Sequence, residues 1–244
     1  MEARDNEYSF QSRVRFSEID HTEKITLPGI INYFQDCSTF QSEDLGVGVQ
    51  HLKEQHGAWL MNFWQIQISR YPELCEEVKI ITIPYEFDRF YGKRNFAMLD
   101  ASGRYLAKAN SLWFYFNTER ARPMRVPQCE KDAYGTEERL DMNYTEERKL
   151  ALPEQMEALK PFPVQRVHLD TNGHVNNGQY VRMAEEFLPA DDVIRELRVE
   201  YRTAAHLGDT IYPRRGTVTD GDGAWTVLAL CDADGQPYVT LKVQ

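Results

Sequence analysis

Three polar residues in the second half of the chain could carry out chemistry together. Asp170, Asn172 and His174 occupy alternate positions in the run HLDTNGHVNNGQYV. In an extended segment, this spacing places all three side chains on one face. A carboxylate, an amide and an imidazole on one face can orient a water, hold a carbonyl group and move a proton. The alternative is an Asx-rich turn that caps a helix and leaves His174 in solvent without a chemical role.

The elements around this run are expected to be a short strand before it and a helix after it. The strand-like segment VQRVHL precedes Asp170, and Asn176 or Asn177 is suited to cap the helix. Apolar residues then recur with the spacing of a buried helix face, at Tyr180, Val181, Ala184, Phe187 and Leu188.

The same pattern occurs near the start of the chain, which indicates an internal repeat. Asp20, Thr22 and Lys24 repeat the spacing after the strand-like segment VRFSEI, and Thr26 and Pro28 suit the N-cap and first turn of a helix. The apolar face of that helix is expected at Ile30, Ile31, Phe34 and Cys37. Because threonine and lysine replace the asparagine and histidine, the first copy is interpreted as catalytically silent.

Strand-like stretches with turn signals follow each predicted helix. The first set is WLMNFWQIQIS, VKIITIPYEF, RNFAMLD and RYLAKANSLWFYFN, and the second is ELRVEYR, TIYPRRGTVT, AWTVLALCD and PYVTLKV. The polar segment between the copies is expected to be a linker, with its charge run facing solvent. The pattern therefore predicts an α+β chain of two units, each a helix followed by an antiparallel sheet.

The composition excludes several classes of protein. Hydrophobic residues make up 42% of the 244 residues, which predicts a globular core, and no apolar run is long enough for a membrane helix. The net charge of −10 argues against a general binder of nucleic acid or anionic membrane. The opening MEARDNEYSF lacks an apolar signal region, so a cytoplasmic protein is expected.

The four cysteines are scattered without CxxC pairs, at Cys37, Cys75, Cys129 and Cys231. This spacing argues against a zinc site and favours unpaired thiols in a reducing compartment. We therefore expect neither a metal nor another cofactor.

The run HLDTNGHVNNGQYV resembles the signature of the acyl-ACP thioesterases, the family of the plant plastid enzymes and their bacterial relatives. Further resemblance lies in the segments TLPGIINYFQDCSTFQSEDLGVG, RYLAKANSLWFYFNTERARPMRVP and RVEYRTAAHLGD, so that it covers nearly the whole chain. The length and the lack of a plastid-type transit peptide fit a bacterial member. The resemblance implies a tandem hot-dog fold, in which each unit is a central helix wrapped by an antiparallel sheet.

The family hydrolyses the thioester that joins a fatty acyl chain to the phosphopantetheine arm of acyl carrier protein, abbreviated ACP. The resemblance implies an N-terminal hot-dog at residues 1–125 that holds the acyl chain, a linker at 126–162, and a catalytic hot-dog at 163–244. Ordinary core packing is the alternative for each candidate residue of the acyl tunnel, namely Phe34, Phe40, Trp59, Met61, Phe63 and Trp64.

Asp170, Asn172 and His174 match the family's catalytic residues. We expect the aspartate to orient and deprotonate a water, the asparagine to position the water or the carbonyl, and the histidine to hydrogen-bond the water or protonate the departing thiolate. Because no Gly-x-Ser-x-Gly elbow is present, a serine acyl-enzyme is not expected. Backbone N–H groups at the helix start are candidate oxyanion donors, at Val175, Asn176 and Asn177.

One departure from the family concerns the run EYRTAA. The plant enzymes carry a Glu-Cys pair where this chain has Ala204 and Ala205. A mechanism with that cysteine as nucleophile is therefore untenable, and a mechanism that requires that glutamate is in doubt. Glu200 and His206 lie nearby in the sequence, without a physical reason to assign either a role.

The expected partner is an acidic carrier protein, so docking on this acidic chain needs a local basic face. Candidate clusters, for which scattered surface charge is the alternative, are Arg120 with Arg122 and Arg125, Lys93 with Arg94, and Arg214 with Arg215. Both a monomer and a homodimer are compatible with two units in one chain.

Two rival functions remain. An acyl-CoA thioesterase of the hot-dog type would share the chemistry and differ in the carrier. A non-catalytic acyl-binding protein is favoured only by the missing Glu-Cys pair, whereas the intact second copy beside a silent first copy favours an enzyme. A dehydratase fits less well, because its histidine and acidic residue come from two different chains.

Overall fold

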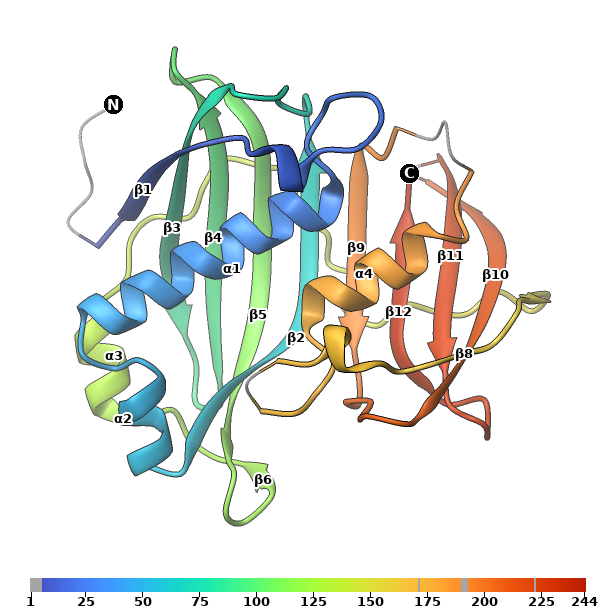
Figure 1. Cartoon of the computed structure of the whole chain (residues 1–244). Helices are drawn as coiled ribbons and strands as arrows, with labels where there is room; N and C mark the ends of the chain where they lie inside the picture. Colours follow the sequence, from blue (N-terminus) through green and yellow to red (C-terminus); the bar gives the residue numbers. More distant parts are fainter. Residues whose placement is uncertain (1–5, 171, 190–192, 222) are drawn as a thin grey trace. The chain divides into compact units, whose positions relative to one another are not determined.

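The computed structural model describes residues 6–170, 172–189, 193–221 and 223–244 (Figure 1). Two compact units make up the chain. Unit 1 comprises Met1–Asn62 and Ile66–Tyr144, and unit 2 comprises Phe63–Gln65 and Thr145–Gln244. Each unit contains one principal helix and an antiparallel sheet, which confirms the predicted α+β class.

The strands of unit 1 are hydrogen-bonded in the order β1-β3-β4-β5-β2, with β6 beside β5. The long apolar runs identified in the sequence form β2, β3, β4 and β5, as expected from their β-branched and aromatic residues. The strand expected at VRFSEI is wrong, because Phe16–Glu18 form η1 and the strand β1 lies before them. The elements of unit 1 are β1 (Tyr8–Arg13), η1 (Phe16–Glu18), α1 (Leu27–Asp44), α2 (Val49–Glu54), β2 (Gly57–Ile68), β3 (Glu77–Phe87), β4 (Tyr91–Asp100), β5 (Tyr105–Asn117), β6 (Arg122–Pro123) and α3 (Gln128–Tyr134).

Helix α1 lies across the sheet of unit 1, in contact with β1, β3 and β4 (Figure 1). Thr26 is its N-cap and accepts a hydrogen bond from the Gly29 N–H at 3.1 Å, while a proline occupies the first turn. The predicted apolar face is confirmed, since Ile30, Ile31, Phe34 and Cys37 are all buried.

The strands of unit 2 are hydrogen-bonded in the order β9-β12-β11-β10-β7, with β8 also beside β10. Helix α4 packs against β11 and β12 (Figure 1). The elements of unit 2 are β7 (Glu157–Ala158), β8 (Phe162–Pro163), η2 (Arg166–His168), α4 (Asn177–Glu185), β9 (Glu196–Tyr201), β10 (Thr210–Asp220), β11 (Gly223–Cys231) and β12 (Pro237–Val243).

Helix α4 begins as predicted but ends early. Asn176 is the N-cap, and its side chain accepts a hydrogen bond from the Gly178 N–H at 2.9 Å. The helix stops at Glu185, so Phe187 lies beyond it and stacks on Phe162 at 6.0 Å instead. A physical reason is Pro189, because the α conformation is disfavoured for the residue before a proline.

The segment between the two copies is more ordered than its charge run suggests. Leu140 is 3% exposed and packs with Ile81 and Leu99 of unit 1. In unit 2, the Glu147 carboxylate lies 3.0 Å from the Lys242 ammonium and 3.3 Å from the Arg198 guanidinium. Thus the expectation that the charge run faces solvent is wrong at Glu147, because its carboxylate is held by two cations of unit 2.

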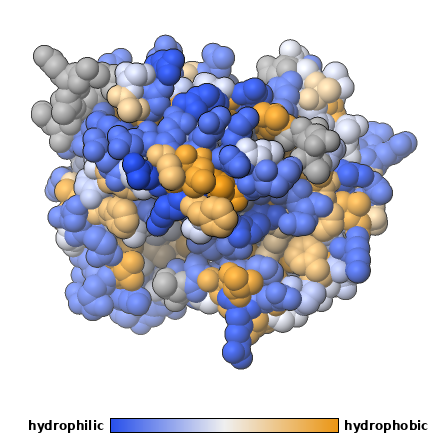
Figure 2. Space-filling view, turned by 45° about the horizontal axis from the view of Figure 1, so that its top comes forward, coloured by the Kyte–Doolittle hydropathy of each residue, from blue (hydrophilic) through white to orange (hydrophobic). Residues whose placement is uncertain are grey.

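The surface carries separate apolar side chains among polar ones. On the face shown in Figure 2, hydrophilic residues surround hydrophobic patches. Phe16 and Val167, at 81% and 72% exposure, are the most exposed large apolar residues of the described chain. Scattered exposed apolar residues are common on protein surfaces and indicate no function by themselves. No helix within the described ranges has the length and apolarity needed to cross a membrane.

Candidate active site

The three predicted catalytic residues lie on one tight loop between η2 and α4. Asp170 Oδ1 accepts hydrogen bonds from the N–H groups of Asn172 at 2.8 Å and His174 at 3.1 Å. The Asp170 N–H donates to the His174 carbonyl at 2.8 Å, and Gly173 adopts the left-handed φ of +75° that the turn requires. The Asx turn is therefore real, and one carboxylate oxygen of Asp170 is used to build it.

Solvent reaches all three residues. Asn172 is exposed, and Asp170 and His174 are half-buried. Among the described residues, no hydrogen bond engages Asp170 Oδ2 or the His174 ring. The loop thus presents a carboxylate oxygen, an amide and an imidazole that are open to a substrate or a water.

The candidate oxyanion donors differ in what they already bind. The Val175 N–H donates to the Ala205 carbonyl at 3.0 Å, and the Asn176 N–H donates to the His168 carbonyl at 2.9 Å. Asn177 is the first residue of α4, and no described acceptor takes its N–H. A helix N-terminus favours a developing negative charge, so the Asn177 amide is the best placed of the three.

Two buried tyrosines hold the start of α4 against the sheet. The Tyr201 hydroxyl donates to the Asn177 carbonyl at 3.0 Å, and the Tyr180 hydroxyl accepts from the Ala205 N–H at 2.7 Å. Burial raises the pKa of Tyr180 to about 12 and also raises the pKa of Tyr201. Both hydroxyls therefore stay protonated and act as neutral anchors.

The loop that carries Ala204 and Ala205 also brings in His206. The backbones of His174 and His206 form an isolated antiparallel bridge, and their rings lie 5.0 Å apart at 85°. Asp209 completes this turn, with Oδ2 2.8 Å from the His206 N–H. Sequence reasoning assigned no role to His206 and did not consider Asp209, because nothing local predicts that this turn faces His174.

Unit 1 contains an equivalent loop with the same backbone hydrogen bonds and different side chains. Asp20 Oδ1 accepts from the Thr22 N–H at 2.7 Å, and the Asp20 N–H donates to the Lys24 carbonyl at 3.0 Å. Glu23, with φ of +61°, takes the place of the glycine. The backbone is thus copied, while threonine and lysine stand at the positions of the amide and the imidazole. That this copy is catalytically silent stays a prediction.

The predicted tunnel residues do not share one environment. Phe34, Met61, Phe63 and Trp64 are buried, Trp59 is half-buried, and Phe40 is 45% exposed. Within unit 1, Phe34 packs on Phe96 at 5.4 Å, whereas Phe40 packs on Phe10 at 5.3 Å. The division of the chain groups Phe63 and Trp64 with unit 2. Their role in acyl binding stays a prediction.

The candidate basic clusters differ in how exposed their side chains are. Arg94 is 8% exposed, donates to Thr82 and lies 4.9 Å from the Tyr134 ring, so it is part of the core and unsuited to docking. By contrast, the three arginines near β6 are exposed and have no carboxylate partner among the described residues, namely Arg120, Arg122 and Arg125.

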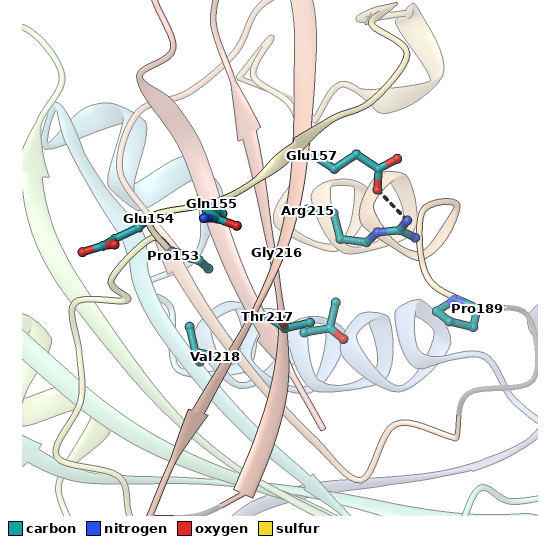
Figure 3. A pocket seen from close by; sticks show the side chains of 10 residues that line it. Pro153, Glu154, Gln155, Glu157, Pro189, Arg215, Gly216, Thr217 and Val218 are labelled. Atoms are coloured by element: carbon teal, nitrogen blue, oxygen red, sulfur yellow. Dashed lines mark hydrogen bonds and ion pairs between the residues drawn. The ribbon is translucent and has the colours of Figure 1, made fainter.

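A hollow of about 770 Å³ lies along β10 in unit 2 (Figure 3). Pro153, Gln155 and Pro189 form part of its wall, and Arg215 is bound there to Glu157 at 2.8 Å. None of the predicted catalytic residues lines this hollow. In the described part of the chain, no cluster of three or more histidine, cysteine or acidic side chains could hold a metal.

Each unit, a central helix packed on an antiparallel sheet, defines a hot-dog, and the chain is a tandem hot-dog protein. The chain belongs to the acyl-ACP thioesterase family, because the family's N-terminal domain model matches residues 5–133 and its C-terminal domain model matches residues 152–223.

Solved structures support the fold. An acyl-ACP thioesterase from Bacteroides thetaiotaomicron shares 20% identity at a TM-score of 0.87, covering 98% of this chain and 97% of that one. The 12:0-ACP thioesterase from Umbellularia californica shares 18% identity at a TM-score of 0.82, covering 100% of this chain and 98% of that one.

Among curated proteins, oleoyl-acyl carrier protein thioesterase 2 from Arabidopsis thaliana is 26% identical over 223 residues. The match covers 81% of this chain and 59% of that protein, so the chain spans well under two thirds of that relative.

Proposed function

We propose that the protein hydrolyses fatty acyl-ACP thioesters to a free fatty acid and holo-ACP by direct attack of water. Membership of the family supports this proposal. The observation that carries it is the loop of Asp170, Asn172 and His174 at the N-terminus of α4, with a carboxylate oxygen and an imidazole left open.

In this proposal, Asp170 uses Oδ1 to hold the loop and Oδ2 to orient and deprotonate the water. His174 protonates the thiolate as the carbon–sulfur bond breaks, and Asn172 positions the water or the carbonyl. The Asn177 amide stabilises the oxyanion from the helix start. No covalent intermediate is needed, so alanines at positions 204 and 205 are compatible with the reaction.

The test is release of free thiol from a panel of medium- to long-chain acyl-ACPs. Asp170→Asn and His174→Ala are expected to lower kcat by about 10²- to 10⁴-fold, the usual contribution of a positioned acid or base. The matched controls are Asp20→Asn and Lys24→Ala in the equivalent loop of unit 1, which should leave kcat unchanged. Full activity in both unit 2 variants would overturn the assignment of the site.

The carrier is proposed to dock on the basic tip formed by Arg120, Arg122 and Arg125. Replacing all three with glutamate should raise the KM for acyl-ACP several-fold at low salt, because like charges then meet an acidic carrier. Added salt should reduce the difference in KM between the variant and the parent, and kcat should change little. The control replaces Arg148 and Lys149 with glutamate, since these residues are also exposed. An equal rise in KM from both sets of substitutions would argue against docking of the carrier at the basic tip.

Carrier identity is tested by comparing kcat/KM for matched acyl-ACP and acyl-CoA. Preference for the CoA ester would make the protein an acyl-CoA thioesterase instead. Ala204 and Ala205 favour a second candidate, a non-catalytic acyl-binding protein. Tight binding of acyl-ACP by the parent protein without thiol release would establish that candidate in place of the enzyme.

A further inference from the structure

The turn opposite the catalytic loop brings a second imidazole to the proposed active site. His206 lies across an antiparallel backbone bridge from His174, with the ring centroids 5.0 Å apart and the planes nearly perpendicular. The side chain of His206 is 61% exposed, whereas His174 is half-buried. His206 is therefore the more exposed of two imidazoles that lie in contact, and His174 is the one that we assign as the proton donor.

Asp209 supports the His206 ring from within the same turn. Its Oδ2 accepts the His206 N–H at 2.8 Å and lies 3.8 Å from His206 Nδ1. The Tyr238 hydroxyl donates to the same oxygen at 3.4 Å. Gly208, at φ of +90°, allows the chain to close this turn. The carboxylate thus fixes the backbone position from which the His206 ring faces His174.

Unit 1 contains the same turn with different chemistry. The Glu73 N–H donates to Glu76 Oε2 at 3.0 Å, and the Glu76 N–H donates to the Glu73 carbonyl at 3.1 Å. Lys24 bridges to Glu73 as His174 bridges to His206. Both units thus share this backbone arrangement. In unit 2 it brings two imidazole rings into contact, whereas in unit 1 the bridged residues are a lysine and a glutamate.

The carboxylate of the turn is also differently engaged in the two units. In unit 1, the Arg70 guanidinium binds Glu76 at 2.8 Å. Arg70 lies three residues before Glu73, and Thr203 holds the equivalent position before His206. A threonine cannot neutralise the acid as an arginine does, so the groups that donate to Asp209 Oδ2 within the described chain are the His206 backbone N–H and the Tyr238 hydroxyl.

We propose that His206, on the turn held by Asp209, relays protons between solvent and His174 through a water and so reloads the proposed proton donor. The proposal rests on the thioesterase function. Water forms the new carbon–oxygen bond and gives one proton to Asp170. The carbon–sulfur bond then breaks with its electron pair on sulfur, which takes a proton from His174. His206 returns a proton to His174 and takes one from solvent, while Asp170 releases its proton to solvent.

The titratable groups around the two rings are few. Asp170 and Asp209 are the flanking carboxylates, and Tyr180 and Tyr238 approach from α4 and β12. Burial raises the pKa of both tyrosines, so they remain neutral near pH 7.

The test compares His206→Asn with His21→Asn, which removes an exposed imidazole from the equivalent loop of unit 1. In dilute buffer without imidazole, kcat of the His206 variant should fall by about 10²-fold, the lower end for a positioned proton-transfer group. KM should be unchanged, and added imidazole should restore part of the lost rate. The pH–rate profile should lose the inflection of the second imidazole, and the His21 variant should behave as the parent.

An unchanged kcat and pH profile in the His206 variant would overturn the proposal while leaving the thioesterase intact. A loss of kcat that imidazole does not restore, together with a changed KM, would indicate a structural role for the turn. That outcome would overturn the proposal as well. An inactive parent protein would refute the thioesterase and this inference together. NMR provides a readout independent of activity, because the ring signals of His174 should shift when His206 is replaced. Unchanged signals would count against contact between the two rings.

Discussion

The equivalent loops before α1 and α4 each contain one residue in the left-handed backbone conformation. This residue is glycine in unit 2 and glutamate in unit 1. Gly173 has φ of +75° and Glu23 has φ of +61°. A side chain at such an angle brings its Cβ close to the neighbouring carbonyl oxygen. Unit 1 tolerates this strain at Glu23, whereas the loop with Asp170 and His174 avoids it.

Gly173→Ala is expected to lower the free energy of unfolding by about 1–2 kcal/mol, because alanine must then adopt the left-handed conformation. It should also lower kcat, since Asp170 and His174 are held by the backbone of this loop. The companion variant Glu23→Gly should keep kcat and lose no stability. Thermal unfolding measures the stability and thiol release measures kcat. Equal losses of stability and kcat in Gly173→Ala and Glu23→Gly would contradict the prediction.

At the scale of elements, the two principal helices begin with side-chain caps of the same kind. Thr26 Oγ1 accepts the Gly29 N–H, and Asn176 Oδ1 accepts the Gly178 N–H. Each cap satisfies one of the N–H groups that have no partner within the helix. The unit 2 cap has a second consequence, because Asn177 directly follows it and carries the proposed oxyanion donor.

Thr26→Ala and Asn176→Ala should each cost about 1 kcal/mol of stability, the usual loss for a removed N-cap. Only Asn176→Ala should also lower kcat, since the start of α4 is then free to fray beside the loop. Chemical denaturation gives the stabilities, and thiol release gives the rates. A normal kcat in Asn176→Ala, at the expected loss of stability, would separate helix capping from catalysis.

At the scale of the whole molecule, a buried acid in unit 1 links stability to pH. Glu130 on α3 is fully buried, accepts a hydrogen bond from Trp59 Nε1 at 3.0 Å and lies 3.3 Å from His51 Nε2. Burial is the largest influence and raises the pKa of Glu130 above the ordinary 4.5, although Trp59 and His51 act in the opposite direction. The folded protein thus holds this proton more tightly than the unfolded chain.

Because the folded-state pKa is raised, the contribution of Glu130 is fully present below pH 4.5 and is lost as pH rises through the folded value. Glu130→Gln keeps an acceptor for Trp59 and removes the titration. Its Tm should therefore rise relative to the parent between acidic and neutral pH. Glu86→Gln, at an exposed ion pair with Lys93, is the control and should show no such trend. A parent-to-variant difference in Tm that does not change with pH would refute the linkage.

Sequence periodicity predicted the two principal helices, the long strands after them, the repeat and the loop at the start of α4. These features depend on local spacing and caps, such as Thr26 and Asn176, which act within a few residues. Periodicity was wrong for the strand expected at VQRVHL, where Arg166–His168 form the 3-10 helix η2. The family signature added the expected role of Asp170, Asn172 and His174. The early end of α4 was missed although Pro189 is visible in the sequence, because the apolar spacing continued past it.

Only the tertiary structure decided which distant residues meet. It placed His206 against His174, buried Arg94 beneath Tyr134, and joined Glu147 of the linker to Lys242 of β12. Such pairs depend on strand register and on how a loop returns to the sheet, which local periodicity does not encode. The sequence therefore determines the principal elements and the loop of Asp170, Asn172 and His174, while the fold determines which imidazole meets that loop and which charges stay exposed.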